Sequence, residues 1–193
     1  MARNRDTMTR RDFLAMAALA PIGPALLSRR WLNATAVGPS GGVEDVLIVR
    51  FSNDGKRLGA ERVPKIVKAE SDWKKQLSPL AFEVTRHADT ERSFSGAYWN
   101  LHEKGIFRCV CCDTALFTSA NKFDSGTGWP SFWQPIAREN VVGPKKVSRT
   151  GDETEATCRR CDAHLGDIFD DGPPPTGIRY CIDSVSLRFV KAE

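Results

Sequence analysis

The chain has 193 residues, of which 41 % are hydrophobic, so it is long enough for one globular domain with a substantial core. Its formal net charge is +4, and this whole excess lies in residues 1–36, which hold six arginines and two aspartates. The remaining residues therefore carry equal numbers of basic and acidic groups, which argues against a nucleic-acid-binding protein because phosphate binding needs clustered positive charge.

Residues 1–36 resemble a twin-arginine export signal. Two arginines at positions 10–11 precede an apolar run over 13–27, and the small residues 34–36 suit cleavage by a signal peptidase. The run contains two prolines and is shorter than the ~20 apolar residues of a bilayer-spanning helix. We therefore expect a cleaved signal peptide, an exported periplasmic protein and no permanent membrane anchor. The alternative is a basic amphipathic N-terminus with no targeting role.

The next segments are a linker and a predicted hairpin. Residues 37–42 are rich in glycine and read as flexible. Within the extension 43–69, an apolar, β-branched strand is expected over 46–51, followed by an Asn-Asp-Gly turn at 53–55. The return strand is expected over 62–68, at a sheet edge because it contains a proline.

Two short helices should open the main domain, residues 70–193. Ser71 is expected to cap the first helix, and Ser78, which is followed by proline, to cap a second one that runs to about His87. From Ser93 onward, glycine-rich turns alternate with short aromatic and β-branched runs. This pattern predicts a mainly β (α+β) fold with antiparallel sheets.

Two C-x-x-C pairs share one spacing and one local pattern, in which Asp and then Leu follow each pair. Cys109 and Cys112 form the first pair, and Cys158 and Cys161 the second, 45 residues further on. This arrangement predicts a knot of two turns that offers four thiolates to one structural Zn²⁺. Disulfides are the alternative in an exported chain. A twin-arginine signal favours zinc, because that pathway carries proteins that have already folded. Cys111 is expected to be a small packed side chain.

From Ser93 to the end, the sequence contains a series of distinctive motifs, at residues 94–100, 122–132, 164–169, 171–173, 175–177 and 179–184. In these motifs it resembles the B-type methionine sulfoxide reductases, which act on the R epimer of methionine sulfoxide. With the helical segment before them, they extend over roughly residues 70–190. The resemblance implies two antiparallel sheets with the zinc opposite the active site. It also implies that the four paired cysteines bind zinc and that Cys181 is the nucleophile.

The residues around Cys181 suit this chemistry. A thiolate must attack the sulfoxide sulfur, and a free cysteine titrates near ~8.5. Arg179 and Asp183 lie two positions before and after Cys181, hence on the same strand face, and Arg179 should favour the thiolate. The products are a cysteine sulfenic acid and methionine. The alternative is a buried, inert cysteine.

Further site residues follow from the resemblance. Trp129 matches the family tryptophan that receives the substrate methyl group, and Phe132 is placed beside it in the substrate-binding site, with a core position as its alternative. His164 is assigned as a hydrogen-bond donor or acid near the sulfoxide oxygen.

Three positions depart from the commonest family pattern. Asp167 stands where His is usual, Asp183 where Asn is usual, and Thr127 where a resolving cysteine is often found. Either Cys111 or an outside thiol must then reduce the sulfenic acid, and we expect a thioredoxin-like reductant. We also expect one of the two aspartates to stay protonated and to supply a proton to the sulfoxide oxygen, because like charges raise pKa values.

The predicted function is the reduction of methionine sulfoxide in oxidised proteins by a monomer that binds no nucleic acid. Two other functions remain open from the sequence. One is a zinc-ribbon-like protein-binding module in which Cys181 is structural. The other is a thiol-disulfide oxidoreductase that uses the C-x-x-C pairs, which metal content would distinguish.

Overall fold

The computed structural model describes residues 43–144 and 155–192. Its helices are α1 (Glu70–Gln76) and α2 (Pro79–His87), with three short 3₁₀ turns, η1 (Ser119–Asn121), η2 (Arg138–Asn140) and η3 (Ser184–Ser186). Its strands are β1 (Asp45–Phe51), β2 (Arg57–Pro64), β3 (Gly105–Cys109), β4 (Ala115–Thr118), β5 (Lys122–Phe123), β6 (Ser131–Phe132), β7 (Val141–Val142), β8 (Glu155–Cys158), β9 (His164–Phe169), β10 (Arg179–Ile182) and β11 (Leu187–Lys191). The predicted signal peptide and linker lie outside the described residues. Among the residues that are described, no helix has the length and apolar character needed to cross a membrane.

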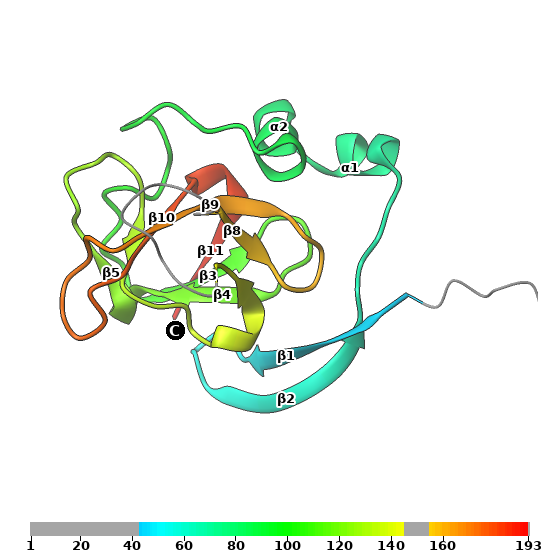
Figure 1. The fold of residues 1–193 in the computed structure, drawn as a ribbon, viewed down its shortest axis with the longest axis horizontal. Coiled ribbons are helices and arrows are strands. Elements are labelled where there is room, and N and C mark those ends of the chain that lie inside the picture. Colours follow the sequence, from blue (N-terminus) through cyan, green and yellow to red (C-terminus); the bar gives the residue numbers. More distant parts are fainter. Residues whose placement is uncertain (1–42, 145–154, 193) are drawn as a thin grey trace, which may run out of the picture. The chain divides into compact units, whose positions relative to one another are not determined.

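Three antiparallel sheets make up the β structure (Figure 1). Strands β1 and β2 form a separate hairpin, six strands pair in the order β5-β6-β10-β9-β8-β7, and three pair in the order β11-β3-β4. The expectation of a mainly β domain with two antiparallel sheets and two short helices before them is confirmed. The central position of β10 between β6 and β9 matters most for function, because β10 carries Cys181.

The hairpin turns at the predicted Asn-Asp-Gly segment, but its return strand begins earlier than expected. The amide of Ser52 donates to the carbonyl of Lys56 at 3.0 Å, and Gly55 takes the positive φ of +88° within this turn. The return strand therefore starts at Arg57, and the prediction that it spans 62–68 is wrong at both ends. It stops at Pro64, which pairs with Asp45 and has no N–H for further pairing.

A buried asparagine attaches the hairpin to the domain. The side chain of Asn140 accepts from the Val49 amide at 2.7 Å and donates to the carbonyls of Val49 and Ala115, each at 2.8 Å. Asn140 is fully buried. Its hydrogen bonds are therefore shielded from water. Loss of one partner would leave a buried polar group unsatisfied and would lower the stability of the fold.

Of the two predicted N-cap residues, one caps its helix and the other does not. Ser78 caps α2, with its Oγ accepting from the amide of Ala81 at 3.3 Å. Ser71 does not cap α1, whose N-cap is Ala69. The carbonyl of Ala69 already accepts from the amide of Asp72 at 3.0 Å, so Ser71 lies inside the first turn.

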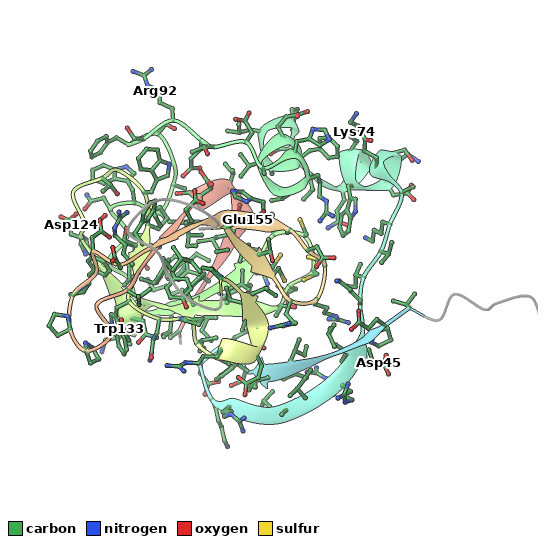
Figure 2. The ribbon with its side chains drawn as sticks, in the orientation of Figure 1. Asp45, Lys74, Arg92, Asp124, Trp133 and Glu155 are labelled. Atoms are coloured by element: carbon green, nitrogen blue, oxygen red, sulfur yellow. The ribbon has the colours of Figure 1, made fainter. Side chains whose placement is uncertain are left out.

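An aromatic core lies between the two larger sheets, where side chains fill the space between the ribbons (Figure 2). Phe132 stacks on Phe117 with a centroid distance of 4.4 Å and meets Phe107 edge-on at 5.0 Å. Phe132 has no exposed surface. Its placement in the substrate-binding site is therefore corrected: this ring packs the core beneath the site and cannot reach a substrate in this structure.

Candidate functional site

Each of the two C-x-x-C segments folds into a turn, and the two turns have the same conformation. Cys109 ends β3 and Cys158 ends β8, and each cysteine carbonyl accepts from an aspartate amide four residues on, at 2.9 Å from Asp113 and 3.0 Å from Asp162. Both aspartates have a positive φ, of 62° and 52°. The repeated Asp after each pair in the sequence therefore marks a left-handed position that aspartate tolerates better than most side chains.

The two turns bring four sulfurs together. The Sγ atoms of Cys109, Cys112, Cys158 and Cys161 lie within 4.8 Å of one another. Two of the separations are 3.7 Å, between Cys109 and Cys161, and 3.5 Å, between Cys112 and Cys158. A tetrahedral zinc with Zn–S bonds of ~2.3 Å needs sulfurs about 3.8 Å apart. All six cysteines are free, so the cluster fits a four-thiolate metal site and not a pair of disulfides.

Side chains from the two helices hold the same turns in place. Arg86 donates to the carbonyl of Cys161 at 2.8 Å, and Gln76 donates to the carbonyl of Cys111 at 2.7 Å. Cys111 is 5 % exposed and its sulfur bonds to the hydroxyl of Thr85 at 3.4 Å. The sixth cysteine is thus enclosed against α2, as expected for a packed side chain.

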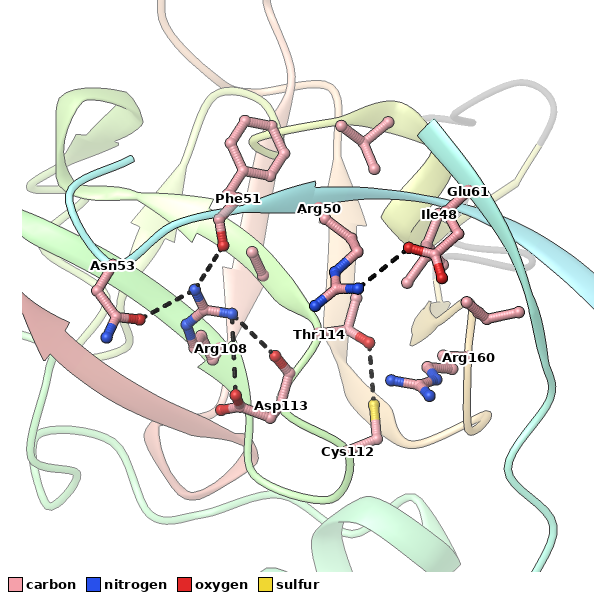
Figure 3. Close-up of a pocket in the computed structure, with 13 residues that line it drawn as sticks. Ile48, Arg50, Phe51, Asn53, Glu61, Arg108, Cys112, Asp113, Thr114 and Arg160 are labelled. Atoms are coloured by element: carbon pink, nitrogen blue, oxygen red, sulfur yellow. Dashed lines mark hydrogen bonds and ion pairs between the residues drawn. The ribbon is translucent and has the colours of Figure 1, made fainter. Parts of the chain in front are cut away.

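A cavity of about 380 Å³ lies between the hairpin and the β3–β4 connection (Figure 3). Its lining includes Arg108, which donates to the carbonyl of Phe51 at 2.9 Å and to Asn53 at 3.2 Å. It also includes Arg50, which is paired with Glu61 at 3.2 Å. Arg108 therefore attaches the hairpin to the domain, whereas the Arg50–Glu61 pair joins the two strands of the hairpin to each other. None of the predicted catalytic residues lines this cavity, so it is not the candidate active site.

Cys181 lies in the middle of the six-stranded sheet, at the register positions of Ser131 on β6 and Asp167 on β9. Burial raises the pKa of its thiol, while the Arg179 charge and a hydrogen bond with the Thr127 hydroxyl act to lower it. Arg179 thus favours the thiolate, as predicted. Burial is the larger effect, so the pKa of the thiol is raised overall.

Arg179 is held by a partner that the sequence analysis did not single out. Its Nε and Nη2 donate to the two carboxylate oxygens of Asp171, each at 2.8 Å, and its guanidinium lies 4.4 Å from the Phe169 ring centroid. A bidentate pair of this kind fixes the plane of the guanidinium as well as its position. The only available signal was that Asp171 belongs to the 171–173 motif.

Asp183 is a buried carboxyl close to Cys181, the predicted nucleophile. It is 2 % exposed, and burial raises its pKa to about 7, with the charges of Glu91 and Asp167 adding to the rise. A hydrogen bond from the Glu91 amide and the proximity of His164 act in the opposite direction. Asp183 therefore gains a proton near neutral pH, as the hypothesis of one protonated aspartate requires.

His164 and Asp167 both lie on β9, next to β10. The Nδ1 atom of His164 is 2.8 Å from a carboxylate oxygen of Glu155, and the His164 side chain is largely buried. Asp167 raises the pKa values of both Cys181 and Asp183 through its charge. The structure thus places the two predicted acids on the strand next to the one that carries Cys181.

Trp129 is partly buried and its indole N–H donates to the carbonyl of Glu91 at 3.1 Å. An open groove of about 410 Å³ lies beside this region and is bordered by Ser125, Thr127 and Arg179. Thr127 and Arg179 are also the two groups that lower the pKa of the Cys181 thiol. The groove therefore shares Thr127 and Arg179 with the surroundings of Cys181, although Cys181 and Trp129 do not line it.

Comparison with known proteins identifies the family. The model of the SelR domain matches residues 77–191. The chain belongs to the SelR family. It is 53 % identical over 127 residues to "Peptide methionine sulfoxide reductase MsrB" of Herminiimonas arsenicoxydans, covering 65 % of this chain and 91 % of that protein. It is 50 % identical to the Hahella chejuensis protein of the same name, covering 67 % and 93 %, and 54 % identical to that of Thioalkalivibrio sulfidiphilus, covering 64 % and 90 %. The resemblance to B-type methionine sulfoxide reductases is confirmed.

Proposed function

We propose that this protein is a peptide-methionine (R)-S-oxide reductase that uses Cys181 as its nucleophile. The observation that carries the proposal is the position of Cys181 on β10. There, Arg179, Thr127, Asp167 and Asp183 all act on its thiol, next to an open groove. Membership of the SelR family supplies the substrate class, methionine sulfoxide in oxidised proteins.

The reaction transfers one oxygen atom. The Cys181 thiolate attacks the sulfoxide sulfur, the sulfoxide oxygen takes up a proton, and collapse of the adduct leaves methionine and a sulfenic acid on Cys181. Asp183 is the group we assign as proton donor, because its pKa of about 7 keeps a proton available near neutral pH. His164 supports the same step through a hydrogen bond to the sulfoxide oxygen, and the Trp129 ring receives the substrate methyl group.

A thioredoxin-like dithiol completes the cycle. It reduces the sulfenic acid to a thiol, is itself oxidised to a disulfide, and one water is released. Thr127 stands in hydrogen-bonding contact with Cys181 and cannot form a disulfide with it. Cys111 is enclosed against α2 in the turn between β3 and β4, so an outside thiol is the better candidate for reductant.

The four-cysteine cluster is proposed to hold one structural Zn²⁺ through Cys109, Cys112, Cys158 and Cys161. Its donor set and sulfur separations fit that ion. Four thiolates fill the coordination sphere, so bound zinc supplies folding free energy and no catalytic position. We also propose export to the periplasm through the twin-arginine signal in residues 1–36, supported by the arginine pair, the short apolar run and the small residues that follow it.

Turnover of methionine sulfoxide peptides tests the activity. The full chain should reduce the R epimer with a dithiol reductant, leave the S epimer unchanged and lose all activity in Cys181→Ser. Metal analysis of the same samples should give one zinc per chain in both proteins. Equal activity in Cys181→Ser, or turnover of the S epimer alone, would refute the proposal.

A further inference from the structure

Glu91 is the one buried residue in an otherwise exposed loop. The loop follows α2, and its residues 88–90 and Arg92 are exposed, whereas Glu91 is 1 % exposed. Figure 2 shows Arg92 directed away from the fold. An acidic side chain is almost never fully buried unless polar partners compensate its charge. The partners of Glu91 therefore indicate what it does.

The Glu91 carboxylate binds the chain immediately after the predicted proton donor. One of its oxygens accepts from the Ser184 amide at 2.6 Å and the other accepts from the Val185 amide at 3.1 Å. These are charge-assisted hydrogen bonds in a site without water. The surroundings are tight, since a Cβ added at Gly96 would lie 2.3 Å from the carboxylate.

The backbone of the same residue binds two predicted site residues. The Glu91 amide donates to the Asp183 carboxylate at 3.0 Å, and the Glu91 carbonyl accepts from the Trp129 indole N–H at 3.1 Å. Trp129 and Asp183 are separated by 38 and 92 positions from Glu91 in the sequence. One residue therefore connects the group assigned to the substrate methyl with the group assigned to the proton.

We infer that Glu91 is a positioning residue of the active site: its carboxylate anchors the loop on the Ser184 and Val185 amides, so that its backbone fixes Asp183 and Trp129 relative to each other. This inference rests on the proposed function. Glu91 acts through the two residues that it holds. Small displacements of such groups lower the reaction rate, because proton transfer and substrate contact depend on geometry.

Glu91→Gln tests the inference with the smallest change of shape. The glutamine side chain keeps one acceptor oxygen but presents its NH₂ group to one of the two backbone amides. The bonds that anchor the loop on Ser184 and Val185 are therefore weakened. We expect kcat for the R epimer to fall roughly 10- to 100-fold, with KM rising less.

The pH profile provides a readout that a purely structural role would not move. The charged groups that face Asp183 are Glu91 from the loop, His164 and Asp167 from β9, and Cys181 from β10. Of these, Glu91→Gln removes one negative charge, so the decline of activity at high pH should begin at a lower pH. Glu91→Asp keeps the charge but is shorter, so it should restore the wild-type pH profile with a reduced kcat. This variant also serves if Glu91→Gln does not fold.

Asn140→Ala is the matched control, because Asn140 is also a fully buried polar side chain that bonds backbone groups but lies at the hairpin. It should lower the melting temperature and leave kcat, KM and the pH profile unchanged. Unchanged kinetics and pH profile in both Glu91 variants, or an equal loss of kcat in Asn140→Ala, would overturn the inference. If the wild type itself reduces no sulfoxide, the proposed function fails, which is a separate outcome.

Discussion

Arg179 and Asp171 are joined by two parallel hydrogen bonds of 2.8 Å, and this pair sets the position of a cation that lowers the pKa of the Cys181 thiol. Burial acts against it and raises the same pKa. The reactivity of Cys181 therefore depends on a balance between burial, which the sheet imposes, and a charge that Asp171 holds in place.

Arg179→Gln removes that charge and should slow the alkylation of Cys181 by iodoacetamide. A rise of the thiol pKa by about one unit would reduce the rate at pH 8 roughly tenfold. Arg188→Gln is the control, because Arg188 is exposed and pairs with Asp113 near the four-cysteine cluster. Equal alkylation rates in the wild type and Arg179→Gln would show that Arg179 has no influence on the thiol.

Thr127→Cys should give the protein an internal resolving thiol, because the Thr127 hydroxyl hydrogen-bonds to Cys181. After one turnover without reductant, we expect a disulfide between position 127 and Cys181, seen by mass spectrometry as the loss of two hydrogens. The wild type should retain a sulfenic acid under the same conditions. In the control Thr114→Cys, the new cysteine lies near the four-cysteine cluster and should form no disulfide with Cys181. A variant at 127 that keeps a free sulfenic acid would contradict the geometry.

Asp183 should make both stability and activity depend on pH. Its folded pKa of about 7 lies above the ordinary 3.8, so the stability that it contributes is complete at low pH and is lost as the pH rises from about 4 through 7. Asp183→Asn should then be the more stable protein at pH 8, by on the order of 4 kcal/mol, and similar to the wild type near pH 4. Thermal unfolding across this range measures the difference.

The same substitution tests the assigned proton donor. The activity of the wild type should decline above pH 7, as Asp183 loses its proton, whereas Asp183→Asn should show lower activity without that decline. Asp167→Asn tests the other carboxyl that the sequence suggested. A decline near pH 7 that survives in Asp183→Asn would leave His164 as the acid.

Removal of the metal should destabilise the fold. Cys158→Ser deletes one of the four clustered sulfurs, and because structural zinc binds only the folded chain, the loss should amount to several kcal/mol. Cys111→Ser is the matched control, since Cys111 lies in the same turn as two ligands but outside the cluster. Metal analysis and thermal unfolding should separate the two variants, and a Cys158→Ser protein with wild-type stability would disprove a structural metal.

The sequence predicted those parts of the fold and site that depend on local rules. Ser78 with Pro79 defined the start of α2, and the repeated C-x-x-C-Asp pattern predicted two turns that converge on one cluster. The errors have equally local causes. Ser71 has the residue type of a cap, but α1 begins earlier, with Ala69 as its N-cap. Phe132 belongs to the same motif as Trp129, but its ring is fully buried in the core.

Residues that act across long separations could not be found from the sequence. Glu91 stands in a polar loop with no distinctive pattern, and only the fold brings it against residues more than ninety positions away. Asp171 was part of a recognised motif, but its bidentate pairing with Arg179 requires the turn between β9 and β10. The pKa of Asp183 likewise follows from burial, which no pattern of neighbouring residues encodes.

The central claim is that one sulfur, that of Cys181, takes the oxygen from oxidised methionine. A single-turnover reaction without reductant tests it directly: the full chain is mixed with an excess of an R-sulfoxide peptide and dimedone, and both methionine formation and the modified cysteine are measured. The account predicts one methionine per chain and a dimedone adduct on Cys181 alone, with neither in Cys181→Ser. Methionine formed with Cys181 unmodified, or oxidation found instead among the four clustered cysteines, would contradict it.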